Sequence, residues 1–155
     1  MLISSVICIT LMASTTGLAY TGYYVNQVLP SPAVQTVSQP AYSQETLQEV
    51  ARVVMAESMG EPIEGMRGVA QVIYERHILW DKGVNEILNS PGQFAEPYGG
   101  TVTEECQNVV NEVFLQGVKE FDSNVTHFYN PEKCDPYWAD TKTVVGTRGG
   151  HRFLY

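Results

Sequence analysis

The distribution of charge along the chain is the sequence feature that most constrains its fold. All 17 acidic and nine basic side chains of the 155 residues lie from Glu45 onward, and the first 44 residues carry none. Residues 45–155 then have the charged fraction of an ordinary globular domain. The sequence therefore predicts one acidic domain over residues 44–155 behind an uncharged leader.

Residues 2–25 of this leader are apolar or weakly polar, and they are just long enough to span a bilayer. They are also rich in Ser, Thr and Gly, and no Lys or Arg precedes them. We expect residues 1–25 to be either a secretory signal cut after Ala19 or a retained weak anchor giving transient membrane association. A third alternative is a buried helix of the domain. The first two alternatives export the rest of the chain.

Residues 26–43 contain three prolines together with Gln, Ser and Thr and show no helical period, which predicts an extended linker. Of the three cysteines, Cys8 lies in the leader. Cys106 and Cys134 are an even pair in an exported domain, so a disulfide and two free thiols are both open. The net charge of −8 argues against binding to nucleic acid, because no basic stripe is present to neutralise phosphates.

Periodicity within residues 44–155 favours helices first and strands afterwards. Apolar residues at helical spacing predict helices over 45–59, 62–78 and 101–121, with a short helix over 85–89. Thr101 and Glu104 have the spacing of a capping box for the helix that follows. Gly65 and Gly68 on the second helix indicate a close approach by another backbone. β-Branched and aromatic residues predict short strands over 125–129, 143–145 and 151–154. The fold class is therefore α+β, mainly helical with a short β element near the C-terminus.

Glu57 is the first candidate for chemistry. It follows Val54 by three residues and Val50 by seven, so it falls on the buried stripe of its helix. Desolvation of a carboxyl group there favours the protonated form, which a general acid needs. The alternative is a structural Glu that pairs with Arg52 or Arg67.

Several aromatic and amide side chains suit a site for sugars, which bind by stacking on rings and by hydrogen bonds from hydroxyl groups to amides. They are Gln93, Phe94, Tyr129, Asn130 and Trp138. Each could equally be a core or turn residue. A metal site of His127, His151, Cys134 and Asp135 matches no compact zinc spacing, so we expect no metal and no cofactor. Cys106 with a histidine would suit a thiol peptidase, but a Cys on an apolar stripe is more often core.

Taken together, residues 45–155 resemble the catalytic domain of the SleB-type cell wall hydrolases, the family of spore cortex-lytic enzymes. The matching stretches are ARVVMAESMGEP over 51–62, EGMRGVAQVI over 64–73, PGQF over 91–94, THFYNP over 126–131, WA at 138–139 and GGHRF over 149–153. Ser58 and Glu75 depart from the usual pattern, which has Ala and Asn there. The Gly-rich turn before His151 is also longer than usual.

The resemblance implies a small lysozyme-like domain that cuts the glycan strands of peptidoglycan. It assigns the family's catalytic glutamate to Glu57, and it places His151 and Glu61 with the substrate-binding residues. Glu61 would either brace the second helix or line the cleft. We expect a monomer located in the periplasm, in the cell wall or tethered to the membrane facing the wall.

The number of carboxylates bears on the reaction. A hydrolytic glycosidase needs two of them across the scissile bond, and only Asp135 and Asp140 are candidates to partner Glu57. A lytic transglycosylase needs one group that acts as acid and then as base. The single evident glutamate, together with the resemblance, favours 1,6-anhydro products. A hydrolytic muramidase and a non-catalytic peptidoglycan-binding protein remain the alternatives.

Overall fold

The structure is a computed structural model that describes residues 42–155. The predictions for the signal or anchor over 1–25, for Cys8 and for nearly all of the linker over 26–43 lie outside the described residues. Within residues 42–155, no helix is both long enough and apolar enough to cross a membrane. The description below concerns only this part of the chain.

Four helices form the larger part of the fold: α1 (Gln44–Ser58), α2 (Ile63–Leu79), α3 (Val84–Leu88) and α4 (Glu104–Gln116). Ser43 caps α1 because its hydroxyl accepts a hydrogen bond from the Thr46 N–H at 3.1 Å. Pro62 is the N-cap of α2, one residue before the helix. The apolar stripes of α1, α2 and α4 meet in one core, which includes Leu47, Val54, Ile73, Val110 and Phe114.

Helix α4 is shorter at both ends than the predicted range of 101–121. Thr103, not Thr101, caps it by accepting from the Cys106 N–H at 3.2 Å, so the predicted capping box is wrong. The helix ends at Gly117, whose φ of 70° places it in the left-handed region that glycine adopts without strain. Phe121 is buried as expected, but from the loop after the helix.

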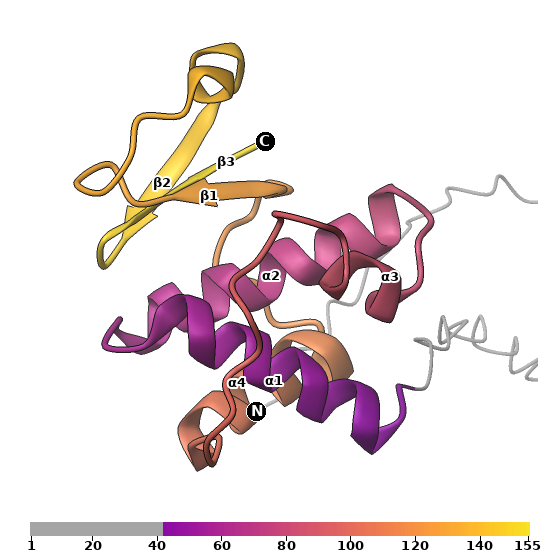
Figure 1. The fold of residues 1–155 in the computed structure, drawn as a ribbon. Helices are drawn as coiled ribbons and strands as arrows, with labels where there is room; N and C mark the ends of the chain where they lie inside the picture. Colours follow the sequence, from indigo (N-terminus) through magenta and orange to yellow (C-terminus); the bar gives the residue numbers. More distant parts are fainter. Residues whose placement is uncertain (1–41) are drawn as a thin grey trace, which may run out of the picture. The chain divides into compact units, whose positions relative to one another are not determined.

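Three short strands form an antiparallel sheet in the order β1–β3–β2, confirming the α+β class. They are β1 (His127–Tyr129), β2 (Val144–Arg148) and β3 (His151–Leu154). The sheet lies on one side of α2, and α1 and α4 lie on the other side of α2 (Figure 1). A 3₁₀ helix, η1 (Tyr137–Thr141), lies in the connection from β1 to β2 and was not predicted. It positions Trp138.

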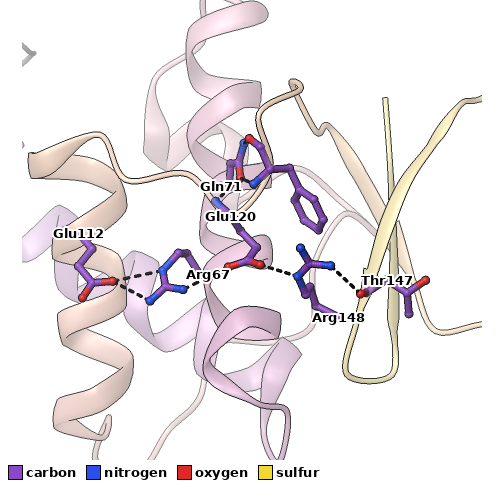
Figure 2. Close-up of polar contacts among 7 residues, drawn as sticks. Arg67, Gln71, Glu112, Glu120, Thr147 and Arg148 are labelled. Atoms are coloured by element: carbon purple, nitrogen blue, oxygen red, sulfur yellow. Dashed lines mark hydrogen bonds and ion pairs between the residues drawn. The ribbon is translucent and has the colours of Figure 1, made fainter.

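A polar network joins the sheet to the helices (Figure 2). Arg67 of α2 pairs with Glu112 of α4 at 3.0 Å and with Glu120 of the following loop at 3.1 Å. Glu120 also pairs with Arg148 of β2 at 2.5 Å. One carboxylate thus links helix α2 to the β2–β3 hairpin through two guanidinium groups.

Gly68 of α2 allows the sheet to approach the helix. A Cβ atom on Gly68 would lie 2.5 Å from Cζ of Phe153, so at this position an aromatic ring of β3 makes the close contact, not a backbone. At Gly65 a Cβ atom would lie 3.1 Å from Cβ of Glu61 and 3.6 Å, an ordinary contact distance, from the Arg148 carbonyl oxygen, so the tight contact there is also with a side chain. The sheet therefore packs closely on α2 at Gly68.

Replacing Gly68 with Val should lower the free energy of unfolding by about 1–3 kcal/mol, because the added methyl groups overpack the fully buried Phe153 ring. Urea denaturation followed by circular dichroism measures this change. Gly99→Val is the matched control, since a Cβ atom on Gly99 meets nothing within 4 Å. Equal stability of the two variants would contradict the close contact.

Candidate active site

A cleft of about 840 Å³ lies between the end of α1, the end of α2, the sheet and the loops over 92–93 and 130–142. Six of the eight predicted site residues line it: Glu57, Gln93, Tyr129, Asn130, Trp138 and His151. The other lining residues are Ala56, Arg76, Gly92, His127, Phe128, Lys133, Cys134, Pro136, Thr141 and Lys142. Phe94 and Glu61 do not line this cleft. Residues that lie far apart in the sequence, from Ala56 to His151, thus meet at one surface.

Glu57 comes from the last turn of α1. The prediction that it is buried is wrong: it is half-buried, and the fully buried residue of that turn is Ser58. Its Oε1 accepts a hydrogen bond from the Ala95 N–H at 2.5 Å, which fixes the carboxyl group against the 92–95 loop. Neither alternative partner pairs with it: Arg67 binds Glu112 and Glu120, and Arg52 makes no ion pair with a described side chain. Glu57 therefore faces the cleft without an ion pair to a described side chain.

Arg76 is a cleft residue that the sequence analysis missed. It is only 4% exposed, and its Nε donates to the Thr126 carbonyl at 2.7 Å. Its guanidinium lies 5.1 Å from the Phe94 ring centre and 5.2 Å from that of Trp80. Burial lowers the pKa of Arg76 to about 10, with the Glu57 charge opposing the shift, so it stays charged at neutral pH. The available signal was its position three residues after Ile73, on the buried stripe of α2.

Phe94 therefore has a different place from the one predicted. Its ring lies beneath Arg76 and packs on the hydrophobic core, with its centre 6.4 Å from that of Phe128. Phe94 supports two residues that line the cleft and does not itself face it. A cation over an aromatic ring gains roughly 0.5–2 kcal/mol, depending on its desolvation.

Aromatic rings form the opposite wall. Trp138 packs with its ring centre 5.3 Å from His127 and 5.8 Å from Tyr129. Arg152 of β3 donates to the Tyr129 hydroxyl at 3.0 Å and holds that ring from behind. Such flat surfaces with amides beside them, here Asn130, suit the stacking and hydrogen bonding of a sugar ring.

Glu61 lies in the connection from α1 to α2 and contacts the turn between β2 and β3. Its Oε2 accepts from the Gly150 N–H at 2.7 Å, and its Oε1 is 3.8 Å from Nδ1 of His151. Gly149 adopts a φ of 56°, and a Cβ atom there would collide with the Glu61 carboxylate. Glu61 thus holds the Gly-rich turn. It lies close to His151 without a hydrogen bond to Nδ1, and burial lowers the pKa of His151 from its ordinary value.

His127 should make the fold sensitive to acid. Burial lowers its pKa to about 4, with the positive charges of Lys142 and Arg76 adding to the shift. As pH falls below about 6.5, the His127 ring becomes protonated in the unfolded chain but stays neutral in the folded chain. The difference in protonation at His127 therefore lowers the free energy of unfolding as pH falls from about 6.5 to 4. His127→Gln should therefore lose less stability than the wild type over that range in urea titrations. Equal losses, or an NMR titration midpoint of the His127 ring near 6.5, would contradict this.

The cysteines are not bridged. Cys106 is fully buried and its Sγ lies 3.5 Å from the Ala51 carbonyl oxygen, whereas Cys134 is exposed. The disulfide alternative is therefore wrong. Burial raises the pKa of Cys106 to about 11, which disfavours the thiolate that a peptidase nucleophile requires. Within residues 42–155, no group of three or more His, Cys, Asp or Glu side chains could hold a metal ion.

The departure from the expected pattern at Glu75 lies outside the cleft. Glu75 is 3% exposed, and its Oε1 pairs with Nζ of Lys119 at 2.7 Å and with Nε2 of Gln71 at 3.4 Å. Glu75 thus helps to hold the 117–126 loop in place through its ion pair with Lys119. Ser58, the other departure, donates to the Val54 carbonyl at 2.5 Å within its own helix.

Known proteins share this fold. The crystal structure of the catalytic domain of the Bacillus cereus SleB protein is 26% identical, with a TM-score of 0.68, over 75% of this chain and 94% of that chain. The catalytic domain of the germination-specific lytic transglycosylase SleB from Bacillus anthracis is 27% identical, with a TM-score of 0.67, over 75% and 98%. The resemblance inferred from the sequence is thereby confirmed.

Curated relatives agree with the structures. A spore cortex-lytic enzyme of Oceanobacillus iheyensis is 29% identical over 116 residues, which are 72% of this chain and 42% of the relative. One of Bacillus cereus is 27% identical over 116 residues, 72% of this chain and 45% of the relative. The chain thus spans less than half the length of these relatives. The family described as Cell Wall Hydrolase matches residues 60–154, and the chain belongs to this family of cell wall lytic enzymes.

Proposed function

We propose that residues 44–155 cleave the glycan strand of peptidoglycan between N-acetylmuramic acid and N-acetylglucosamine, as a lytic transglycosylase. One observation carries the choice of reaction: Glu57 is the only carboxylate among the described residues that line the cleft. Asp135 and Asp140, the candidates for a second carboxylate, are exposed and do not line it. This lining favours a reaction that uses one carboxyl group over a hydrolysis that uses two.

The reaction needs one group that changes role. The Glu57 carboxylic acid donates its proton to the glycosidic oxygen as the bond from that oxygen to C1 of the muramic residue breaks. The resulting carboxylate removes the proton of the muramic C6 hydroxyl, whose oxygen bonds to C1 and closes the 1,6-anhydro ring. Glu57 ends protonated, and no water is consumed. Trp138 and Tyr129 would stack on the sugars, while Gln93 and Asn130 would bind their hydroxyl and acetamido groups.

Mass spectrometry of digested peptidoglycan tests the proposal. Anhydro-muropeptides as the new ends support the transglycosylase reaction. Products that gain the mass of water and carry reducing ends would show a hydrolytic muramidase instead. A protein that binds the wall and releases neither product would be the non-catalytic alternative.

The substrate lies outside the cytoplasmic membrane, so the proposed reaction requires export. Residues 2–25 remain the predicted signal or weak anchor for this step. N-terminal sequencing of the membrane and soluble fractions tests it: a new terminus after Ala19 supports a cleaved signal, whereas an intact Met1 in the membrane fraction supports an anchor.

A further inference from the structure

The cleft has the opposite charge from the rest of the chain. The protein carries a net charge of −8, with only nine basic side chains. Three of the nine, Arg76, Lys133 and Lys142, line the cleft, where Glu57 is the one acidic lining residue. Positive charge is therefore concentrated at this surface of an acidic molecule.

The two lysines are not committed to partners elsewhere. Arg67, Lys82, Lys119 and Arg148 each pair with a carboxylate, whereas neither Lys133 nor Lys142 makes an ion pair with a described side chain. The acidic residues close to them in sequence are exposed and do not line the cleft; these are Glu132, Asp135 and Asp140.

The backbone around the lysines is ordered by hydrogen bonds. The Lys133 N–H donates to the Asn130 carbonyl at 3.1 Å in the turn after β1, and the Lys142 N–H donates to the Ala139 carbonyl at 3.1 Å at the end of η1. The two lysines therefore flank the aromatic wall of Trp138 from both ends of the 130–142 loop.

The charge of both lysines reaches the cleft wall. Lys142 helps burial to lower the pKa of His127, and Lys133 does the same for His151. An excess of positive charge in a concave site attracts an anionic ligand, and this attraction weakens with salt. The sugar rings of the proposed substrate are uncharged. Its negative groups are the carboxylates of the peptide substituents and, on muramic residues without a peptide, the lactyl carboxylate.

We propose that Lys133 and Lys142 form a carboxylate-binding subsite that recognises the charged substituent of the muramic residue. This inference rests on the proposed function and makes the enzyme selective for strands whose substituents keep their negative charge. The subsite also lets an acidic protein bind an anionic polymer, because the positively charged cleft attracts the polymer's carboxylates.

The test uses the full chain with Lys133→Gln/Lys142→Gln and, as a control, Lys82→Gln, which removes an exposed lysine outside the cleft. The wild type and both variants are assayed on native peptidoglycan and on peptidoglycan whose carboxylates have been converted to amides with carbodiimide and ammonia. The wild type should lose about 3- to 10-fold in kcat/KM on the amidated strands, as expected for two partly exposed charge pairs. On native strands the double variant should have a kcat/KM lower than that of the wild type by the same factor. Amidation of the strands should not lower the kcat/KM of the double variant further.

An amidase that removes the peptides frees the lactyl carboxyl group, so the stripped strands carry lactyl carboxylates in place of the peptide carboxylates. If the double variant still differs from the wild type on them, the subsite also accepts the lactyl carboxylate; if the difference disappears, it binds only the peptide carboxylates. Equal kcat/KM of double variant and wild type on native strands would overturn the subsite while leaving the proposed reaction intact. A wild type that cleaves neither material would instead contradict the proposed function.

Discussion

Replacing Glu57 with Gln should abolish lysis, with a loss of at least roughly 10²–10⁴-fold, the usual contribution of general acid–base catalysis. An amide can neither give the proton to the glycosidic oxygen nor remove the proton from the C6 hydroxyl, so both halves of the proposed reaction lose their catalyst. The fold should persist, because the Gln side-chain oxygen still accepts from the Ala95 N–H. Loss of turbidity of a cell wall suspension measures the rate.

Glu96→Gln is the matched control, since Glu96 is exposed near the same loop and does not line the cleft. It should lyse walls like the wild type. Unfolding curves of the two variants should coincide, and Glu57→Gln should still sediment with walls. Lysis by Glu57→Gln at the wild-type rate would remove Glu57 from the chemistry.

Replacing Gln71 with Leu should lower the free energy of unfolding by about 1–4 kcal/mol, because it leaves one buried and one partly buried backbone N–H group without an acceptor. The side-chain oxygen of Gln71 accepts from the N–H groups of Glu120 and Phe121 at 2.9 and 3.0 Å. Its Nε2 donates to the Phe121 carbonyl at 3.0 Å. Leu fills a similar volume but satisfies none of these groups. Urea denaturation measures the difference.

Gln48→Leu is the control, because Gln48 is exposed on α1 and its loss should change stability by less than about 0.5 kcal/mol. The effect of Gln71 should spread beyond its own hydrogen bonds. Segment 117–126 carries Glu120, whose carboxylate links Arg67 to Arg148 (Figure 2). A stability loss in Gln71→Leu no larger than that of the control would show that this loop holds its place without the Gln71 side chain.

The helices were largely predictable from the sequence because their signals are local. The stripes of α1 and α2 repeat within a few residues, and their ends differ from the predicted ones by a single position. Helix α4 was harder, since two threonines compete to cap it and a glycine ends it where the apolar spacing continues to Phe121.

The cleft was only partly predictable because its residues depend on distant contacts. Arg76 is held by the Thr126 carbonyl, fifty residues away, and by the rings of Trp80 and Phe94. No local pattern shows this arrangement. The resemblance and the spacing of α1 both single out Glu57, but spacing along one helix cannot show that the last turn of α1 borders an open cleft, where Glu57 is half-buried.

The strand order has a consequence for when the proposed site can form. Both β1 and β2 pair with β3, which follows them in the chain, and neither pairs with the other. A chain that emerges N-terminus first therefore presents all four helices and Glu57 before either strand has a partner. His151 of β3 and the His127–Tyr129 wall come together only once β3 has emerged. The proposed site is thus assembled only after β3 has been synthesised, and a nascent chain that stops short of β3 carries Glu57 without the complete aromatic wall.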